Sequence, residues 1–347
     1  MKPLVSCIMS NYNTEPVMFR MAIESILNQT LQDFELILID DKSTNEKSKN
    51  IIDEYAKKDS RIVAIYNKVN MGLAGALNEG LKVAQGKYIA RFDTDDICVK
   101  DRFEKQIKYM RANCIDVCST FAHLFGACED VVSTSFYSSE AVAAQLLFSC
   151  YIYHPSVMMT RFFLNKNELT YDTDFDGAED FDLFTRCRNE GAKICIMPKV
   201  LFHYRIHSSS VCFTQKPKQI VLSKRICQRQ LDWMKINYSD NELNLHYILC
   251  GLEEYTEDNY EMLDLWCKKL IETNKIGQYF DTNIFSKIVY NRFLNGLIKS
   301  NLQLSKKIRY ICKNKNLFSI SNIYSVIYKK VYPINYRLKG GSMNARK

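Results

Sequence analysis

Strand-like and helix-like segments alternate along the first 125 residues, and this alternation constrains the fold more than any other feature of the chain. The predicted strands are residues 4–10, 34–39, 62–66 and 88–92. The predicted helices are residues 16–29, 45–57, 72–84 and 101–113. Repeated strand–helix units with short turns form a parallel sheet with right-handed crossovers. We therefore expect an α/β fold with a doubly wound, mostly parallel sheet.

The later part of the chain shows a different pattern. Between residues 126 and 210 we expect helices at 139–149 and 179–190, and apolar extended segments at 154–160, 194–197 and 200–204. Beyond Pro217 the chain becomes helical and rich in aromatic residues. This change predicts an α/β domain over residues 1–214, with halves at 1–125 and 126–214, and a helical C-terminal region over 215–347.

Length and composition are those of a globular protein. With 347 residues, 47% of them hydrophobic, the chain can bury one large core or two smaller ones. Its 13 cysteines are scattered, and a strand begins soon after Met1 without a secretory leader, so we expect reduced thiols and a cytoplasmic protein. No apolar run reaches the roughly 18–20 residues of a membrane-spanning helix, so we expect no integral membrane segment.

The charge is distributed unevenly. Residues 282–347 contain 14 Lys and Arg and no Asp or Glu, whereas the other 281 residues contain 33 bases and 39 acids and sum to −6. Basic residues interleaved with apolar and aromatic ones are typical of a surface that binds anionic lipid. A nucleic-acid-binding arm and a solvated basic helix face are the alternatives.

Three aspartates, Asp93, Asp95 and Asp96, directly follow the fourth predicted strand. Acids at the carboxyl edge of a parallel sheet face the crevice where such folds bind ligands. Clustered carboxylates suit Mg²⁺ or Mn²⁺, usually shared with the phosphates of a substrate. The alternative is an acidic turn that caps the helix beginning near Lys100.

Polar and aromatic residues also follow the first two predicted strands. Ser10 and Tyr12 lie at the end of the first strand, and Asp40 and Asp41 at the end of the second. In a parallel sheet these ends share an edge with the aspartate triplet. A tyrosine ring can stack on a base, and carboxylates can accept a base N–H and hold a ribose hydroxyl. The edge therefore predicts a nucleotide site without a P-loop, although Asp40 or Asp41 taken alone is more typical of a helix or turn cap.

A second acidic segment precedes the helix predicted at 179–190. The spacing from Asp172 resembles the start of an EF-hand loop, but its twelfth position is Leu183 instead of Glu, which excludes calcium binding. Glu179 and Asp180 lie at the first turn of the helix, where a carboxylate has a defined direction and can act as a general base. The alternative is an acid that complements the helix dipole.

A third segment contains Arg205, His207 and Ser210 within a few residues. A guanidinium, an imidazole and hydroxyl groups can together hold a diphosphate leaving group. A surface loop of this composition is the alternative.

The order of these motifs resembles family 2 glycosyltransferases, and is most similar to the bacterial enzymes that build O-antigen and capsule repeat units. The resemblance covers about residues 3–212. Its motifs are VSCIMSNYN from Val5, FELILIDDKS from Phe34, GKYIARFDTDD from Gly86, HPSVMM from His154, the pair Glu179–Asp180, and YRIH from Tyr204.

The resemblance implies a GT-A fold, which is Rossmann-like, and inverting transfer from a nucleotide-diphosphate sugar, commonly a UDP-sugar. It implies donor binding by Ser10, with Tyr12 and Asp41 at the base and Asp95 at the ribose. Asp96, with Asp93, would hold Mg²⁺ or Mn²⁺, and Arg205, His207 and Ser210 would lie by the diphosphate or the metal. Asp180 would be the base, and His154 and Glu179 would lie on the acceptor side.

The resemblance also implies partners and one departure. The acceptor in this family is often a glycan linked through diphosphate to a polyprenyl lipid, so we expect a peripheral protein at the cytoplasmic membrane face, held by residues 282–347, and no nucleic-acid partner. Many relatives carry Arg before the Asn of the helix after the third strand. Here Leu77 precedes Asn78, which puts a phosphate contact from that helix in doubt.

Two other functional classes fit parts of the sequence. A metal-dependent nucleotidyltransferase is also α/β with clustered acids, but it usually has a Gly-rich, basic N-terminal loop, which residues 6–12 lack. A non-catalytic protein that binds membranes or nucleic acid would use the basic tail. That hypothesis leaves the acids at three separate strand or helix ends unexplained.

Overall fold

The chain folds into two compact units. The computed structural model describes residues 2–127, 130–133, 138–207, 215–314 and 316–317. The described parts of 1–139 and 152–216 form the first unit, and those of 140–151 and 217–335 form the second. Residues 140–151 therefore pack with the C-terminal helices, although the sequence analysis assigned them to the half at 126–214.

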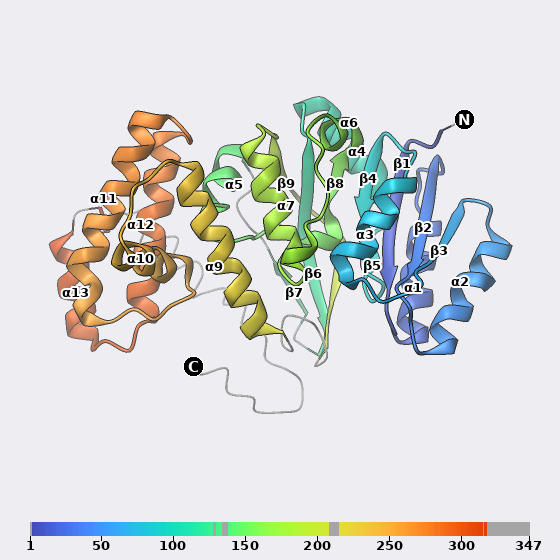
Figure 1. Cartoon of the computed structure of the whole chain (residues 1–347), viewed down its shortest axis with the longest axis horizontal. Helices are drawn as coiled ribbons and strands as arrows, with labels where there is room; N and C mark the ends of the chain where they lie inside the picture. Colours follow the sequence, from blue (N-terminus) through green and yellow to red (C-terminus); the bar gives the residue numbers. More distant parts are fainter. Residues whose placement is uncertain (1, 128–129, 134–137, 208–214, 315, 318–347) are drawn as a thin grey trace. The chain divides into compact units, whose positions relative to one another are not determined.

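The first unit is built on a nine-stranded sheet of order β3-β2-β1-β4-β8-β6-β9-β5, with β7 paired to β6 (Figure 1). The register shows that β1 to β4, β6 and β9 run in one direction, and β5, β7 and β8 in the other. The expected α/β fold with a mostly parallel sheet is confirmed. The strands are β1 (Val5–Asn11), β2 (Phe34–Asp40), β3 (Ile62–Tyr66), β4 (Tyr88–Arg91), β5 (Ile97–Cys98), β6 (Val117–Gly126), β7 (Val131–Ser133), β8 (Met158–Thr160) and β9 (Ile194–Ile206).

Helices cover both faces of the parallel strands. Alternate residues of β1, such as Cys7 and Met9, share a core with Phe19 of α1 and Phe103 of α4, whereas Ile8 points to the opposite face and contacts α3 at Gly80. Alternation of buried side chains toward two helical layers explains the nearly continuous apolar character of β1 and β2. The helices of this unit are α1 (Pro16–Leu27), α2 (Glu46–Lys58), α3 (Gly72–Val83), α4 (Arg102–Asn113), α6 (Arg161–Lys166) and α7 (Glu179–Asn189).

One prediction for the later part of this unit was wrong, and another is refined by the structure. The strand expected at 154–160 is a 3₁₀ turn, η1 (His154–Ser156), followed by the short strand β8. Pro155 lacks an N–H, and Val157 N donates to His154 O at 3.1 Å and closes the turn. The two apolar segments near 194–204 belong to one continuous strand, β9. Pro198 and Lys199, which separate them, lie in an irregularity of the pairing between β9 and β6, where a proline is tolerated.

The second unit is helical and has an aromatic core. Phe148, from the segment 140–151, packs against His246 and Phe285, and His246 Nε2 lies 3.3 Å from Leu147 O. None of the described helices is both long enough and apolar enough to span a bilayer. The helices are α5 (Ser139–Gln145), α9 (Lys216–Trp233), α10 (Asp240–Cys250), α11 (Tyr260–Gly277), α12 (Thr282–Lys299) and α13 (Leu304–Lys313).

Candidate active site

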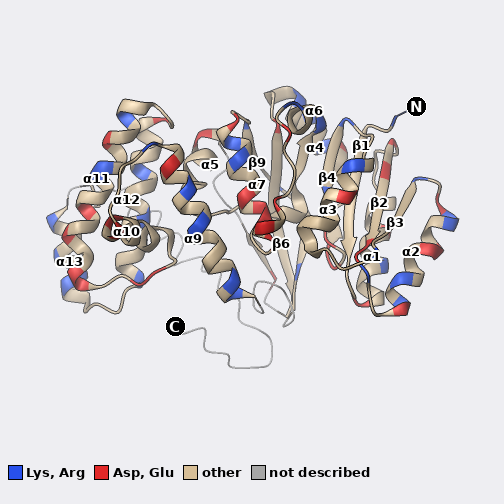
Figure 2. Ribbon diagram, in the orientation of Figure 1, with Lys and Arg blue, Asp and Glu red and all other residues tan. Residues whose placement is uncertain are grey.

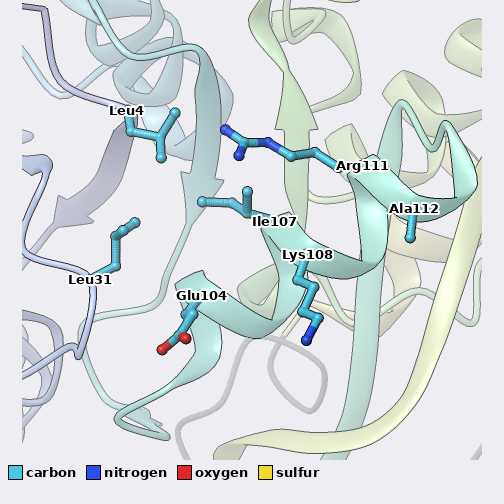
Figure 3. A pocket seen from close by; sticks show the side chains of 7 residues that line it. All are labelled: Leu4, Leu31, Glu104, Ile107, Lys108, Arg111 and Ala112. Carbon is cyan, nitrogen blue, oxygen red and sulfur yellow. The ribbon is translucent and has the colours of Figure 1, made fainter.

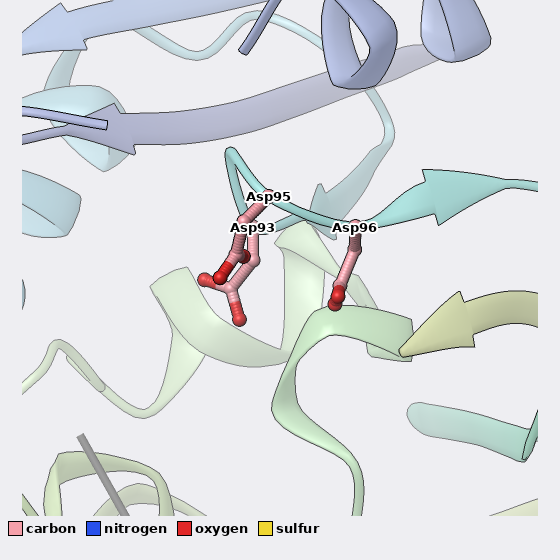
Figure 4. A group of neighbouring side chains, drawn as sticks. All are labelled: Asp93, Asp95 and Asp96. Atoms are coloured by element: carbon pink, nitrogen blue, oxygen red, sulfur yellow. The ribbon is translucent and has the colours of Figure 1, made fainter. Parts of the chain in front are cut away.

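The aspartate triplet lies in the turn between β4 and β5. Carboxylate oxygens of Asp93, Asp95 and Asp96 lie within 4.8 Å of one another. Their side chains project to the same side of the turn (Figure 4). The turn follows the carboxyl end of a parallel strand, which is where ligands bind in such sheets.

Asp96 is the most buried member of this acid turn. Its Oδ1 accepts a hydrogen bond from Arg205 N at 2.8 Å, and its Oδ2 is buried without a partner among the described residues. Burial, followed by the charges of Asp93 and Asp95, raises the pKa of the Asp96 carboxyl well above its usual value. An unpartnered buried carboxylate oxygen among other acids is stabilised by a cation. The residues present therefore fit a hard divalent ion such as Mg²⁺ or Mn²⁺.

The end of β9 lies against the acid turn. His207 Nε2 lies 2.8 Å from Asp95 Oδ2, and Arg205 Nε donates to Asp95 O at 2.7 Å. The Arg205 guanidinium stacks 4.5 Å from the centre of the Phe125 ring, and its Nη2 is buried without a partner among the described residues. Arg205 thus supports the turn, while its contact with a diphosphate stays a prediction. Ser210 lies outside the described residues.

The ends of β1 and β2 form the neighbouring part of the edge. Asn11 pairs with Asp40 across these strands, and the ring of Tyr12, the next residue, is 53% exposed and free to stack on a planar group. Asp41 is buried, and its carboxylate accepts hydrogen bonds from Asn67 Nδ2 at 2.8 Å and Met71 N at 3.0 Å. Asp41 therefore shapes the loop before α3.

Ser10 occupies the next-to-last position of β1, opposite Ile39 of β2. The donor-binding roles of Ser10, Tyr12 and Asp41 stay predictions.

The candidate base lies at the start of α7. Asp180 Oδ1 accepts from Phe181 N at 2.7 Å, and burial raises the pKa of the Asp180 carboxyl. The start of α7 lies near the acid turn: Arg91 forms an ion pair with Asp93, its backbone N donates to Val157 O at 3.0 Å, and His154 Nδ1 of the adjoining turn η1 lies 3.7 Å from Glu179 Oε1. Burial, more than the charges of Asp95 and Asp180, raises the pKa of Asp93. Burial and the charge of Asp180 raise the pKa of Glu179 to about 7. Carboxyls with raised pKa values near a crevice are candidates for proton transfer.

His154 lies beside this helix start. Its Nε2 is 2.8 Å from the hydroxyl of Tyr171, and its Nδ1 is 3.7 Å from Glu179 Oε1. Burial, and then the charge of Arg91, lower the pKa of His154 well below its usual value, so the ring is neutral. A neutral imidazole at this position can orient a hydroxyl group without adding charge.

Two residues of this site, Arg91 and Tyr171, were not predicted from the sequence. Arg91 was detectable as the one charged side chain within the apolar run 88–92. The position of Tyr171 depends on tertiary structure: the side-chain amide of Asn78 bridges its backbone, donating to Tyr171 O at 2.8 Å and accepting from Tyr171 N at 2.9 Å. Leu77, which precedes Asn78 on α3, is buried.

A shallow groove of about 530 Å³ lies elsewhere on the first unit (Figure 3). Leu4, one of its lining residues, precedes β1, so the groove is at the opposite end of the parallel strands from the acid turn. It is therefore separate from the candidate site. Its other lining residues are Leu31, Glu104, Ile107, Lys108, Arg111 and Ala112.

The sequence is similar to known glycosyltransferases. The family described as Glycosyl transferase family 2 matches residues 6–169. An uncharacterized glycosyltransferase of Methanocaldococcus jannaschii, MJ1057, is 32% identical over 253 residues, which are 69% of this chain and 87% of that protein. The Escherichia coli UDP-Glc:alpha-D-GlcNAc-diphosphoundecaprenol beta-1,3-glucosyltransferase WfaP is 32% identical over 225 residues, which are 64% of this chain and 85% of that protein.

Solved structures share the fold. Residues 1–349 of TarS from S. aureus, in complex with UDP-GlcNAc, match with a TM-score of 0.58 at 14% identity, covering 85% of this chain and 92% of that one. The Pyrobaculum calidifontis mannosyltransferase PcManGT, in complex with GDP-Man and Mn²⁺, matches with a TM-score of 0.51 at 13% identity, covering 96% and 88%. At these identities the likeness concerns the fold alone, which is the GT-A fold expected from the sequence.

Proposed function

The chain belongs to glycosyl transferase family 2, and we propose that it transfers a sugar, with inversion, from a nucleotide-diphosphate sugar of the UDP class to a hydroxyl group of a glycan acceptor. The observation that supports this proposal is the cluster of Asp93, Asp95 and Asp96, whose carboxylate oxygens lie within 4.8 Å of one another and which is connected through Arg91 and His154 to the start of α7, where Asp180 lies. A base beside a cation-binding cluster suits displacement at a carbon that bears a diphosphate leaving group. Family membership also disfavours the nucleotidyltransferase and non-catalytic hypotheses.

The acid turn would hold the cofactor. Asp96, with Asp93 and with His207 nearby, would bind Mg²⁺ or Mn²⁺, which supplies positive charge that stabilises the leaving diphosphate. The exposed ring of Tyr12 would stack on the base of the donor, Asp41 would accept a base N–H, and Asp95 would hold a ribose hydroxyl. Ser10 and Ser210 would complete the donor site, and Arg205 would stabilise the phosphate charge.

The reaction follows from the position of the base. Asp180 would take the proton of the acceptor hydroxyl as its oxygen attacks the anomeric carbon, which acquires oxocarbenium character. Attack from the side opposite the leaving group inverts the anomeric centre without an enzyme nucleophile. His154 and Glu179 would orient the acceptor hydroxyl.

The acceptor is proposed from the relatives. WfaP is named for a diphosphoundecaprenol-linked acceptor, and TuaG of Bacillus subtilis, 40% identical over 109 residues, for teichuronic acid biosynthesis. We therefore assign this enzyme to the synthesis of a bacterial surface polysaccharide, with a polyprenyl-diphosphate-linked glycan as acceptor. Such an acceptor requires work at the cytoplasmic membrane face, where residues 282–347 would bind anionic lipid.

The proposal is tested by incubating the purified protein with a panel of UDP-, GDP- and dTDP-sugars and Mn²⁺. We expect slow release of the nucleoside diphosphate from one UDP-sugar, and faster release when a lipid-diphosphate acceptor is added. Asp96→Ala serves as the control and should show neither reaction. Release of pyrophosphate from a nucleoside triphosphate, with no turnover of any nucleotide sugar, would contradict the proposal.

A further inference from the structure

Arg91 is a buried cation beside the proposed active site, and no role has been assigned to it so far. It is the last residue of β4, and its backbone is held from two directions: its N donates to Val157 O at 3.0 Å, and its O accepts from Arg102 Nη2 at 3.1 Å. The side chain is 4% exposed. The guanidinium therefore has little freedom to move.

The guanidinium is incompletely paired. Its Nη2 forms an ion pair with Asp93 Oδ1, whereas Nε and Nη1 are buried without a hydrogen-bond partner among the described residues. A buried cation with two unused donors destabilises a fold compared with an apolar side chain of the same size. Such an arrangement is found more readily at functional sites than in purely structural cores.

A second element with acidic side chains lies close to Arg91. The backbone N of Arg91 donates to Val157 O at 3.0 Å, directly after η1, and His154 Nδ1 of η1 lies 3.7 Å from Glu179 Oε1 in the first turn of α7. Burial raises the pKa values of Glu179 and Asp180, and the charge of Arg91 lowers them to a smaller extent. Arg91 therefore connects the acid turn, through its ion pair with Asp93, to the start of the helix that carries the candidate base. A single fixed cation can hold carboxylates from both elements in one arrangement.

We propose that Arg91 is a positioning residue that holds Asp93 and Asp180 in the mutual arrangement needed for transfer. This inference rests on the proposed function. Arg91 does not touch the substrate: it acts through the two carboxylates. The charge of the side chain and its rigid planar geometry both contribute, so lysine is expected to replace it in part and methionine is not.

The first experiment compares Arg91→Met, Arg91→Lys and, as a matched control, Arg111→Met in the exposed part of α4. Arg91→Met should lower kcat by roughly 10²-fold and change the KM for the donor by less than about threefold, because the donor site keeps its residues. Arg91→Lys should recover about tenfold of that loss. Equal losses of kcat in Arg91→Met and Arg91→Lys, or a change confined to KM, would overturn the proposal.

A double variant distinguishes loss of positioning from loss of folding. Removal of Arg91 alone leaves the partly buried Asp93 without its ion-pair partner, so Arg91→Met is also combined with Asp93→Asn, which removes both charges. If Arg91 also positions Asp180, the double variant should have a kcat about tenfold below that of Asp93→Asn alone. Equal kcat values would show that Arg91 acts through Asp93 only, and the proposal would be wrong.

A structural measurement separates this inference from the proposed function. Crystal structures of the wild type, Arg91→Lys and the double variant should show the Asp180 carboxylate in one place in the first two and displaced in the third. An unmoved carboxylate in all three contradicts the positioning role. If the wild type turns over no nucleotide sugar, the proposed function fails, and the positioning of Asp180 is judged from these structures alone.

Discussion

Single carboxylates define the candidate site. Asp96, Asp180 and Glu179 are each partly or fully buried and have raised pKa values, because burial disfavours the charged form. Their backbone partners are nevertheless hydrogen-bond donors that favour the charged form, such as Arg205 N at Asp96 and Phe181 N at Asp180. Each side chain is thus held in direction while its proton affinity is raised, which suits cation binding or proton transfer.

Replacement of Asp96 tests the metal role. Asp96→Ala should abolish Mn²⁺-dependent transfer, because the variant lacks the buried unpartnered oxygen. The melting temperature should be unchanged or higher, since one acid of a repelling cluster is removed. Asp33→Ala, on the exposed loop before β2, is the control and should be fully active. Full activity of the Asp96→Ala enzyme, or of the wild type in EDTA, would show that no metal acts here.

Replacement of Asp180 tests the base. Asp180→Asn keeps the shape of the side chain and removes its proton affinity, so turnover should fall by roughly 10²–10⁴-fold. Binding of UDP and Mn²⁺, measured by calorimetry, should stay close to that of the wild type. Near-normal turnover would move the base to another residue, with Glu179 and Asp182 the next candidates.

Glu179 makes the stability of the metal-free protein depend on pH. Its pKa is raised to about 7 in the folded state, mainly by burial. The contribution of Glu179 to the free energy of unfolding is therefore complete below its unfolded pKa near 4.5, and it is lost as the pH rises through 7. The loss amounts to at most about 3 kcal/mol. Urea unfolding of the wild type and of Glu179→Gln at pH 5 to 8 should show this loss in the wild type only.

The comparison of variants isolates Glu179 from its neighbours. His154 has a lowered pKa, which acts in the opposite direction below its unfolded pKa, and it is present in both proteins. Glu190→Gln, at the exposed end of α7, should behave as the wild type. An identical pH slope in the wild type and Glu179→Gln would show that Glu179 does not hold the proton.

At the scale of elements, the distance between β1 and the residues before β4 is set by a glycine. Gly86 N donates to Ser6 Oγ at 2.8 Å, and Ser6 Oγ donates to Glu35 Oε1 at 2.6 Å. A Cβ atom at Gly86 would lie 2.4 Å from Ser6 N and 2.7 Å from Val5 C. These neighbours are backbone atoms in a central strand, so they cannot move aside without displacing β1.

Gly86→Ala should therefore destabilise the first unit by about 1–3 kcal/mol, the usual range for overpacking. Gly296→Ala in α12 is the matched control, because its Cβ would meet only Tyr255 Cδ2 at 3.8 Å. The control should be neutral or stabilising, since alanine favours helix over glycine by up to about 1 kcal/mol. Denaturant unfolding of both variants measures the difference, and equal stabilities would contradict the close approach at β1.

At the scale of the whole molecule, the basic region is partly structural. The described part of 282–347 includes α12, whose Phe285, Val289 and Leu297 are fully buried, so this helix belongs to the core of the second unit. On α13, Lys306 forms an ion pair with Glu257 at 2.7 Å. Basic and acidic residues both occur along the helices of the second unit, coloured blue and red in Figure 2. Leu304 and Ile308 are 72% and 52% exposed and lie one turn apart on one face of α13. We propose that this face contacts the membrane.

Vesicle binding tests the face on α13. The double variant Leu304→Gln, Ile308→Gln should bind anionic vesicles less than the wild type in co-sedimentation, because apolar insertion and basic attraction act together at such surfaces. High salt should release the wild type. The control, Leu265→Gln with Ile276→Gln, removes exposed apolar residues from α11 and should bind normally. Equal binding of all three proteins, or indifference to lipid charge, would leave α13 a solvated helix.

The pattern of apolar and polar residues by itself determined the strands β1 to β4 and the helices α1 to α4. The predicted elements up to residue 113 agree with β1 to β4 and α1 to α4 to within two residues at every end, because apolar periodicity reports which side chains face a core. The same reasoning brought Asp93, Asp95 and Asp96 to the edge that also holds Tyr12. The carboxyl ends of parallel strands must meet there whatever the rest of the chain does.

Tertiary structure decided what local pattern does not encode. The two apolar segments near 194–204 became one strand through pairing with β6, and residues 140–151 joined the helices of the second unit. Arg205 was predicted as a phosphate ligand from the residues around it, and that role stays a prediction; only the structure shows that its Nε also donates to Asp95 O. Arg91 was not predicted because its proposed role also depends on Asp180, which is distant in the sequence. Periodicity shows that a residue is buried, whereas its partners depend on which surfaces pack together, and that is settled by contacts between segments far apart in sequence.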